Sequence, residues 1–248
     1  TTATAKDRTP EGRGVLVVGV GGLGSPAARV LVQSGVTRFT LVDDDVVDTS
    51  NLHRQTLYEE ADQGRPKVEA AATALRSLAA HDSDLKIDTR RERLLPDTAL
   101  DLIEGHALIL EGADNFASKF LCADAARLAG VPVVQAGAVR WGGWALATLP
   151  GTSACMRCVF EDIPTGRPET CAVAGVIGPV VGVLGALQGA LATQLLGGHQ
   201  EAAGELWHYD GAIGRLRRSP VKPRSGCPLC AGEIKDLDMD RYLNPCAA

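Results

Sequence analysis

The chain has 248 residues, of which 45% are hydrophobic and 22% are charged, and its formal net charge is −5. This composition excludes a disordered protein, and the mild acidity excludes a protein that coats nucleic acid with a basic surface. A chain of this length commonly forms one large α/β unit and can bury a sizeable core.

Apolar strands and amphipathic helices alternate along the first half of the chain. We expect strands at 15–18, 39–42, 85–87, 107–110 and 131–135, and helices at 26–34, 66–79, 97–103 and 118–129. The first helix is expected to begin with Ser25 as its cap and to end before Gly35. Such alternation predicts a Rossmann-like, doubly wound and mostly parallel sheet with helices on both faces.

A glycine-rich turn separates the first expected strand from the first helix. Its glycines are Gly19, Gly21, Gly22 and Gly24. They allow backbone N–H groups to approach phosphates at the helix N-terminus. Asp43 ends the next strand, where a carboxylate can accept hydrogen bonds from ribose hydroxyls. These residues predict a nucleotide site but leave the choice between a dinucleotide and ATP open.

Polar and cationic residues follow that second strand. Ser50, Asn51, Arg54 and Gln55 lie close together in the sequence, and Lys67 stands at the start of the next helix. A triphosphate that is cleaved needs nearby cations, because negative charge develops on the leaving pyrophosphate. Hydride transfer has no such need. We therefore interpret Arg54 and Lys67 as catalytic cations rather than as solvated surface charges.

Asp114 and Asn115 follow the fourth expected strand, at the sheet edge where open α/β proteins bind ligands. A single Asp at this edge suits Mg²⁺, which takes one or two carboxylates together with phosphate oxygens. The alternative is that either residue caps the following helix. Asp45, at the acidic end of the second strand, is a further candidate ligand of the nucleotide.

The seven cysteines include two Cys-x-x-Cys pairs, Cys155 with Cys158 and Cys227 with Cys230. Four thiolates at two tight turns predict a structural zinc site without an open position. A redox function is the alternative, and it would require a separate explanation for each pair. The odd number of cysteines and the lack of a signal peptide argue against a secreted disulfide scaffold.

The segment 172–198 contains no charged residue and is long enough to span a bilayer. However, it is rich in glycine and alanine, contains two glutamines and is interrupted by Pro179. We expect a buried helix that packs closely on another through its glycines, in a soluble cytoplasmic protein without a membrane partner. A hairpin is expected across 206–217.

Taken together, these motifs resemble the ThiF/MoeB/HesA family of ubiquitin-activating-like adenylyltransferases. The resemblance covers about 15–230 and includes the glycine turn, the residues 43–45 and 50–55, Lys67, the Asp114-Asn115 pair, both cysteine pairs and Thr170-Cys171. It implies that Gly22, Asp43, Asn51, Arg54, Lys67 and Asp114 hold ATP and Mg²⁺. The other candidate nucleotide ligands are Gly19, Gly21, Gly24, Asp45, Ser50, Gln55 and Asn115.

The reaction implied by the resemblance is ATP-dependent adenylation of the C-terminal carboxylate of a small ubiquitin-like sulfur carrier with a Gly-Gly end. Because we expect no rhodanese-like domain, sulfur for the thiocarboxylate would come from a donor protein or from sulfide. We expect one family domain over 1–248, with a nucleotide-binding α/β part at 1–140 and a zinc-bearing, carrier-facing part at 141–248. The Gly/Ala-rich helix favours a homodimer.

The remaining cysteines and the N-terminal arm leave questions open. By resemblance, Cys171 is the candidate thiol that attacks the adenylate or receives sulfur, and an inert thiol is the alternative. Cys122 is expected in the core, and Cys246 has no assigned role. Family members carry an Arg-Gln motif whose arginine reaches the partner subunit's phosphates. No such motif precedes residue 15, and Arg8 and Arg13 are the remaining candidates.

Three other functions remain as alternatives. The adenylated carboxylate could belong to a peptide or a small molecule in natural-product biosynthesis. An NAD-dependent oxidoreductase would account for the glycine turn and Asp43, but not for Arg54, Lys67 or the cysteine pairs. A zinc-stapled module that binds a nucleotide without catalysis is the third.

Overall fold

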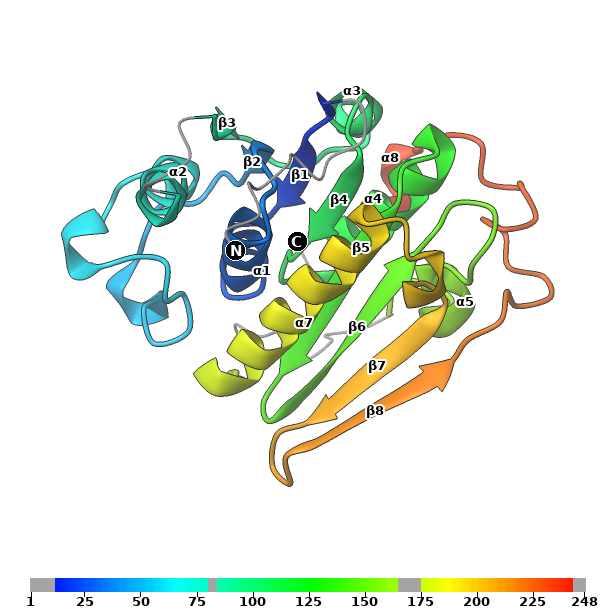
Figure 1. Cartoon of the computed structure of the whole chain (residues 1–248). Coiled ribbons are helices and arrows are strands. Elements are labelled where there is room, and N and C mark those ends of the chain that lie inside the picture. Colours follow the sequence, from blue (N-terminus) through cyan, green and yellow to red (C-terminus); the bar gives the residue numbers. More distant parts are fainter. Residues whose placement is uncertain (1–11, 80–83, 165–174, 243–248) are drawn as a thin grey trace, which may run out of the picture.

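The computed structural model describes residues 12–79, 84–164 and 175–242, which include an eight-stranded sheet (Figure 1). The strands are β1 Val15–Val18, β2 Arg38–Val42, β3 Lys86–Arg90, β4 Leu108–Glu111, β5 Val133–Val139, β6 Gly142–Thr148, β7 Glu205–Asp210 and β8 Arg215–Pro220. Their order is β3-β2-β1-β4-β5-β6-β7-β8. The first five strands pair in parallel, and β6, β7 and β8 are added antiparallel. The prediction of a mostly parallel, Rossmann-like α/β sheet is confirmed.

Helices cover both faces of this sheet. They are α1 Gly24–Gln33, α2 Lys67–Leu78, α3 Ala99–Ile103, α4 Phe116–Ala129, α5 Met156–Phe160, α7 Gly178–Leu196 and α8 Met239–Tyr242. One core cluster joins the sheet to α1, α2 and α7, and a second joins its other face to α3, α4, α5 and α8. All four residues of β1 are apolar because both faces of this strand are buried. Val15 and Val17 belong to the first cluster, and Leu16 and Val18 belong to the second.

Helix α7 is the predicted Gly/Ala-rich helix, and it packs on α1 and across β5 and β6 (Figure 1). A Cβ on Gly185 would lie 2.3 Å from Cγ of Pro26, and one on Gly189 would lie 2.7 Å from Cβ of Val30. The two glycines therefore permit a close approach of α7 to α1, as expected. By length and composition alone α7 could cross a membrane, a weak signal that the core helices of soluble proteins also give.

Some predicted boundaries are wrong. Helix α1 begins at Gly24 with Leu23 as its N-cap, and Ser25 instead donates a hydrogen bond of 2.6 Å to the backbone O of Val20. The glycine turn thus runs directly into the helix without a side-chain cap. Strand β3 extends to Arg90, beyond the predicted 85–87, because its outer residues are exposed and polar and give no apolar signal. The predicted hairpin is confirmed as β7 and β8.

Candidate nucleotide site and cysteine cluster

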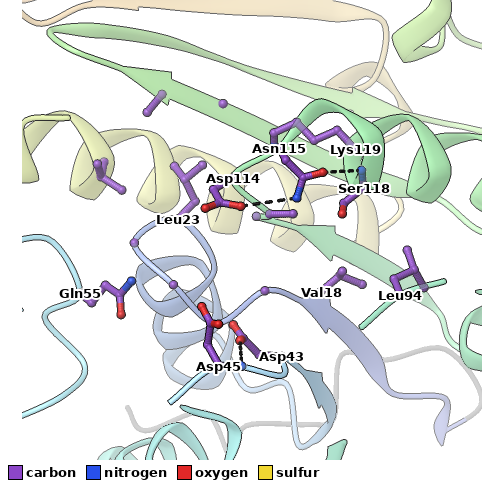
Figure 2. Close-up of a pocket in the computed structure, with 18 of the residues that line it drawn as sticks. Val18, Leu23, Asp43, Asp45, Gln55, Leu94, Asp114, Asn115, Ser118 and Lys119 are labelled. Carbon is purple, nitrogen blue, oxygen red and sulfur yellow. Dashed lines mark hydrogen bonds between the residues drawn. The ribbon is translucent and has the colours of Figure 1, made fainter. Parts of the chain in front are cut away.

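A cavity of about 410 Å³ lies at the carboxyl ends of β1, β2 and β4 (Figure 2). Ten of the predicted site residues line it: Gly19, Gly21, Gly22, Asp43, Asp45, Arg54, Gln55, Lys67, Asp114 and Asn115. Three others, Gly24, Ser50 and Asn51, lie outside its lining. The tertiary structure therefore gathers most of the candidates from separate segments of the chain around one cavity.

The glycine turn is tight at two positions where a side chain cannot be placed. Gly19 has a φ of +80°, and a Cβ there would lie 3.1 Å from the backbone N of Ala113. A Cβ on Gly24 would lie 1.9 Å from the carbonyl O of Gly19. This close packing places the start of α1 at the cavity, where the partial positive charge of its N-terminus favours an anion.

Asp43 is held at the end of β2 by two backbone groups. Its Oδ2 accepts a hydrogen bond of 2.9 Å from N–H of Val20, and its Oδ1 accepts one of 3.0 Å from N–H of Asp45. Burial raises the pKa of Asp43, and the charge of Lys67 partly offsets that increase. Tyr58, which the sequence analysis missed, donates a 2.6 Å hydrogen bond to O of Val20 and supports the same turn.

The two predicted cations approach the cavity from different segments. Nζ of Lys67 lies 2.8 Å from Oδ2 of Asp45, and the lysine side chain is only 6% exposed. Nη2 of Arg54 donates to Oδ1 of Asn51 at 2.6 Å, while its Nη1 lies 3.3 Å from Nε2 of His53. Both cations are thus oriented by neighbouring side chains at the cavity wall.

The sequence left open whether Asp114 or Asn115 caps the following helix and which of them binds a ligand. Oδ1 of Asn115 accepts a 2.8 Å hydrogen bond from N–H of Ser118, so Asn115 is the cap of α4 (Figure 2). Asp114 is not needed as a cap, and its exposed carboxylate lines the cavity beside Asn115. A carboxylate in this position is a suitable ligand for Mg²⁺ next to phosphates.

Further residues line the cavity that the sequence analysis missed, among them Arg93, Leu94, Lys119 and Trp144. Arg93 forms an ion pair of 2.7 Å with Asp44. Leu94 and Trp144 come from a loop after β3 and from β6, so no local pattern connects them to the glycine turn. Of these four residues, only Lys119 could have been suspected from the sequence, because it lies one helical turn after Asn115, the cap of α4.

The four cysteines of the two Cys-x-x-Cys pairs form a second, separate cluster. Their Sγ atoms lie 3.5–3.7 Å apart across the pairs Cys155–Cys158, Cys155–Cys227, Cys158–Cys230 and Cys155–Cys230. A tetrahedral zinc with Zn–S bonds of about 2.3 Å requires sulfur separations of about 3.8 Å. The cluster could therefore hold zinc, and it draws both pairs into one site, which the redox alternative does not explain.

Hydrogen bonds to Sγ of Cys158 stabilise its thiolate form. Burial opposes ionisation of Cys158, but hydrogen bonds from the backbone N–H groups of Arg224 and Cys155 and from the side chains of Cys230 and Cys155 together outweigh it and lower the pKa of Cys158 to about 7. The N–H of Arg224 lies 3.3 Å from Sγ of Cys158. A thiolate ready to bind metal fits a zinc ligand. Cys122 is buried in the core as predicted, and burial raises its pKa.

Three predicted residues, Arg8, Cys171 and Cys246, lie outside the described residues. Arg13 precedes β1, whose opposite end carries the glycine turn, so within one chain it lies away from the cavity.

Comparison with known proteins extends these findings. The sequence model of the ThiF family matches residues 11–229. The chain is 38% identical to the sulfur carrier protein ThiS adenylyltransferase of Escherichia coli K12, and the match covers 90% of this chain and 87% of that protein. It is 34% identical to the SAMP-activating enzyme E1 of Haloferax volcanii, with 96% and 90% covered.

Longer relatives and a solved structure complete the comparison. The adenylyltransferase and sulfurtransferase MOCS3 of Sus scrofa is 38% identical over 94% of this chain, which spans only 51% of that protein. The crystal structure of E. coli MccB with MccA-N7isoASN superposes with a TM-score of 0.77 at 20% identity, covering 88% of this chain and 66% of that one. That likeness shows a shared fold. The extent of the family match and the identity to full-length relatives show that this chain belongs to the ThiF family.

Proposed function

We propose that the protein is an ATP-dependent adenylyltransferase that activates the C-terminal carboxylate of a small ubiquitin-like sulfur carrier. The observation that carries the proposal is the single cavity in which a glycine turn, Asp43, Asp114 and two cations, Arg54 and Lys67, meet. The relatives named adenylyltransferases of sulfur carriers support the same activity. In this proposal residues 1–140 bind the nucleotide, and residues 141–248 carry zinc and face the carrier.

The reaction needs placement and charge neutralisation more than it needs a protein nucleophile. A carboxylate oxygen of the carrier attacks the α-phosphorus of ATP, a new C–O–P linkage forms, and the bond to the β-phosphate breaks as pyrophosphate leaves. The N-terminus of α1 would take the phosphates and Asp43 the ribose. Arg54 and Lys67 would balance the charge that develops on pyrophosphate.

Mg²⁺ is the second group that the site is suited to bind. Asp114 would hold it, and the ion would supply further neutralisation at the phosphate oxygens. The neighbouring acidic residues 43–45 are a poorer site, because Asp44 is paired with Arg93 and Asp45 with Lys67. Asp114 forms no ion pair among the described residues.

The side of the cavity formed by β5 and β6 suits the end of the carrier. It is lined by Gly137 of β5 and by Gly143 and Trp144 of β6. A Cβ on Gly137 would lie 2.7 Å from Nε1 of Trp144, so this wall is already closely packed. A closely packed wall of this kind favours an unbranched peptide end such as Gly-Gly over a bulky one.

Sulfur transfer and assembly complete the proposal. Sulfide would attack the acyl adenylate, releasing AMP and leaving a thiocarboxylate. A donor protein would attack through a persulfide, giving an acyl disulfide; a second thiol, for which Cys171 is the candidate, would then form a disulfide with the donor and release the thiocarboxylate. We also propose that the enzyme is a soluble cytoplasmic homodimer. The outward side of α7 supports a dimer, because it carries small apolar residues and includes Val183, which is 41% exposed.

Pyrophosphate exchange tests this function directly. Radiolabelled pyrophosphate should enter ATP only when Mg²⁺ and a carrier ending in Gly-Gly are both present. A carrier with an amidated C-terminus is the matched control and should give no exchange. With a sulfur source, mass spectrometry should show one oxygen of the carrier replaced by sulfur. Exchange with a peptide or small carboxylate but with no carrier would overturn the sulfur-carrier assignment.

A further inference from the structure

A buried polar network lies directly behind the cavity. Its four side chains come from four elements: Glu111 from β4, Lys119 from α4, Gln135 from β5 and Gln188 from α7. None is more than 5% exposed. Taking an ion pair out of water is costly, and well-packed apolar residues often serve stability equally well. The network therefore requires an explanation beyond core packing.

Glu111 is the centre of the network. Its Oε1 accepts hydrogen bonds from N–H of Ala113 at 2.7 Å and from Nζ of Lys119 at 3.2 Å. Its Oε2 accepts from Nζ of Lys119 at 3.0 Å and from Nε2 of Gln135 at 3.1 Å. Lys119 also donates to the backbone O of Ala136. Since an ammonium group has only three protons, Lys119 has none left for a phosphate, although it lines the cavity.

The hydrogen bond to Ala113 connects the network to the loop 112–115, which carries Asp114. Ala113 precedes Asp114, and the same loop is held from the other side by the glycine turn. N–H of Gly112 donates to O of Val18 at 2.9 Å, and a Cβ on Gly112 would lie 2.8 Å from N of Gly24. The loop is thus clamped between the glycine turn and Glu111, with Asp114 at its outer end beside Asn115 (Figure 2).

We propose that Glu111 and Lys119 are positioning residues, which fix Asp114 relative to the glycine turn so that Mg²⁺ and the phosphates meet in the right geometry. This inference rests on the proposed function, because it assigns the purpose of the network to the adenylation site. Partners behind a metal ligand commonly matter almost as much as the ligand itself. The carboxylate of Glu111 holds the loop, and the ammonium of Lys119 aligns that carboxylate and favours its charged form against the larger effect of burial, which raises the pKa of Glu111.

The test compares two buried ion pairs on the same helix. Glu111→Gln and Lys119→Met disturb the pair behind the cavity, whereas Asp124→Asn disturbs the pair of Asp124 with Arg157 on the zinc side of α4. We expect the first two variants to lose about 10- to 100-fold in pyrophosphate exchange and to need more Mg²⁺ for half-maximal rate. Asp124→Asn should lower the melting temperature but leave the Mg²⁺ requirement unchanged.

A double variant separates positioning from stability. Glu111→Met with Lys119→Met removes both charges, so the melting temperature should return to the wild-type value or exceed it. In this double variant the N–H of Ala113 has lost its acceptor, and we expect exchange and the Mg²⁺ requirement to remain impaired. Recovery of activity together with stability would show that the network is merely structural and would overturn the proposal, as would single variants with an unchanged Mg²⁺ requirement.

A binding measurement distinguishes this inference from the proposed function. Calorimetry of ATP binding with and without Mg²⁺ needs no carrier, and the gain in affinity from Mg²⁺ should be smaller in Glu111→Gln than in wild type. If that difference is found while no carrier supports exchange, the carrier assignment fails and the positioning role stands. If Mg²⁺ strengthens ATP binding equally in both proteins, the positioning role fails.

Discussion

Arg157 lies between the first two cysteines of the cluster, and it is one of the largest fully buried side chains, at 2% exposure. Its Nε lies 2.9 and 3.1 Å from the two carboxylate oxygens of Asp124, and its Nη2 lies 2.8 Å from one of them. Its Nη1 contacts Asp162 at 2.9 Å, and Tyr242 donates a 2.7 Å hydrogen bond to Asp124. We predict that Arg157→Met strongly destabilises the protein.

The size of the effect follows from what remains after the substitution. Asp124 is fully buried, and without Arg157 the hydroxyl of Tyr242 is the one hydrogen-bond donor left to it among the described residues. Removing one partner of a buried pair costs about 3–5 kcal/mol, because the other charge is left uncompensated. For a chain of this length each kcal/mol corresponds to about 2 °C in melting temperature, so we expect a decrease of about 6–10 °C.

Thermal unfolding of the zinc-loaded protein, followed by circular dichroism, measures this decrease. Arg218→Met is the matched control, because Arg218 is 65% exposed and lies 3.4 Å from Glu205. Such a surface pair contributes at most about 1 kcal/mol. Equal melting temperatures for the two variants would refute the reasoning. The double variant Arg157→Met with Asp124→Leu should recover most of the lost stability, since it also removes the buried carboxylate that Arg157→Met leaves without an ionic partner.

Three further predictions concern α7, the cysteine cluster and the nucleotide site. Gly185→Ala should lower the free energy of unfolding in urea by about 1–3 kcal/mol, because the added Cβ would clash with Pro26. Gly182→Ala is the matched control. A Cβ there has no neighbour within 4 Å, so this substitution should raise the free energy of unfolding by up to about 1 kcal/mol. Metal analysis should find one zinc per chain and none in Cys227→Ser; zinc retained by that variant would contradict a four-thiolate site. Because burial raises the pKa of Asp43, this carboxylate should take up a proton earlier than usual as the pH falls, and ATP affinity should fall with it. Calorimetry should find a flatter pH profile in Asp43→Asn, and identical profiles would disprove the role of Asp43.

The parts of the site that could be predicted are those with a local cause. The glycines of the turn, Asp43 at a strand end and Asp114 at another follow from the rule that ligands bind at the carboxyl edge of parallel strands. The cysteine spacing predicted that the fold joins two distant pairs, and the sulfur separations confirm that they meet. Each of these signals lies within a few neighbouring residues, so sequence alone is enough to read it.

The amino-acid sequence by itself determined the alternation of strands and helices, the glycine turn, the Gly/Ala-rich helix and the cysteine pairs, because steric and hydrophobic preferences act between near neighbours. Only the tertiary structure decided that Trp144 and Leu94 line the cavity, that Glu111 and Lys119 form a pair behind it, and that Arg157 is buried rather than solvated. A charged residue in the sequence is normally assigned to the surface, since burial is favourable only when a partner is present. These partners come from other strands and helices, and only the packing of those elements brings them within reach.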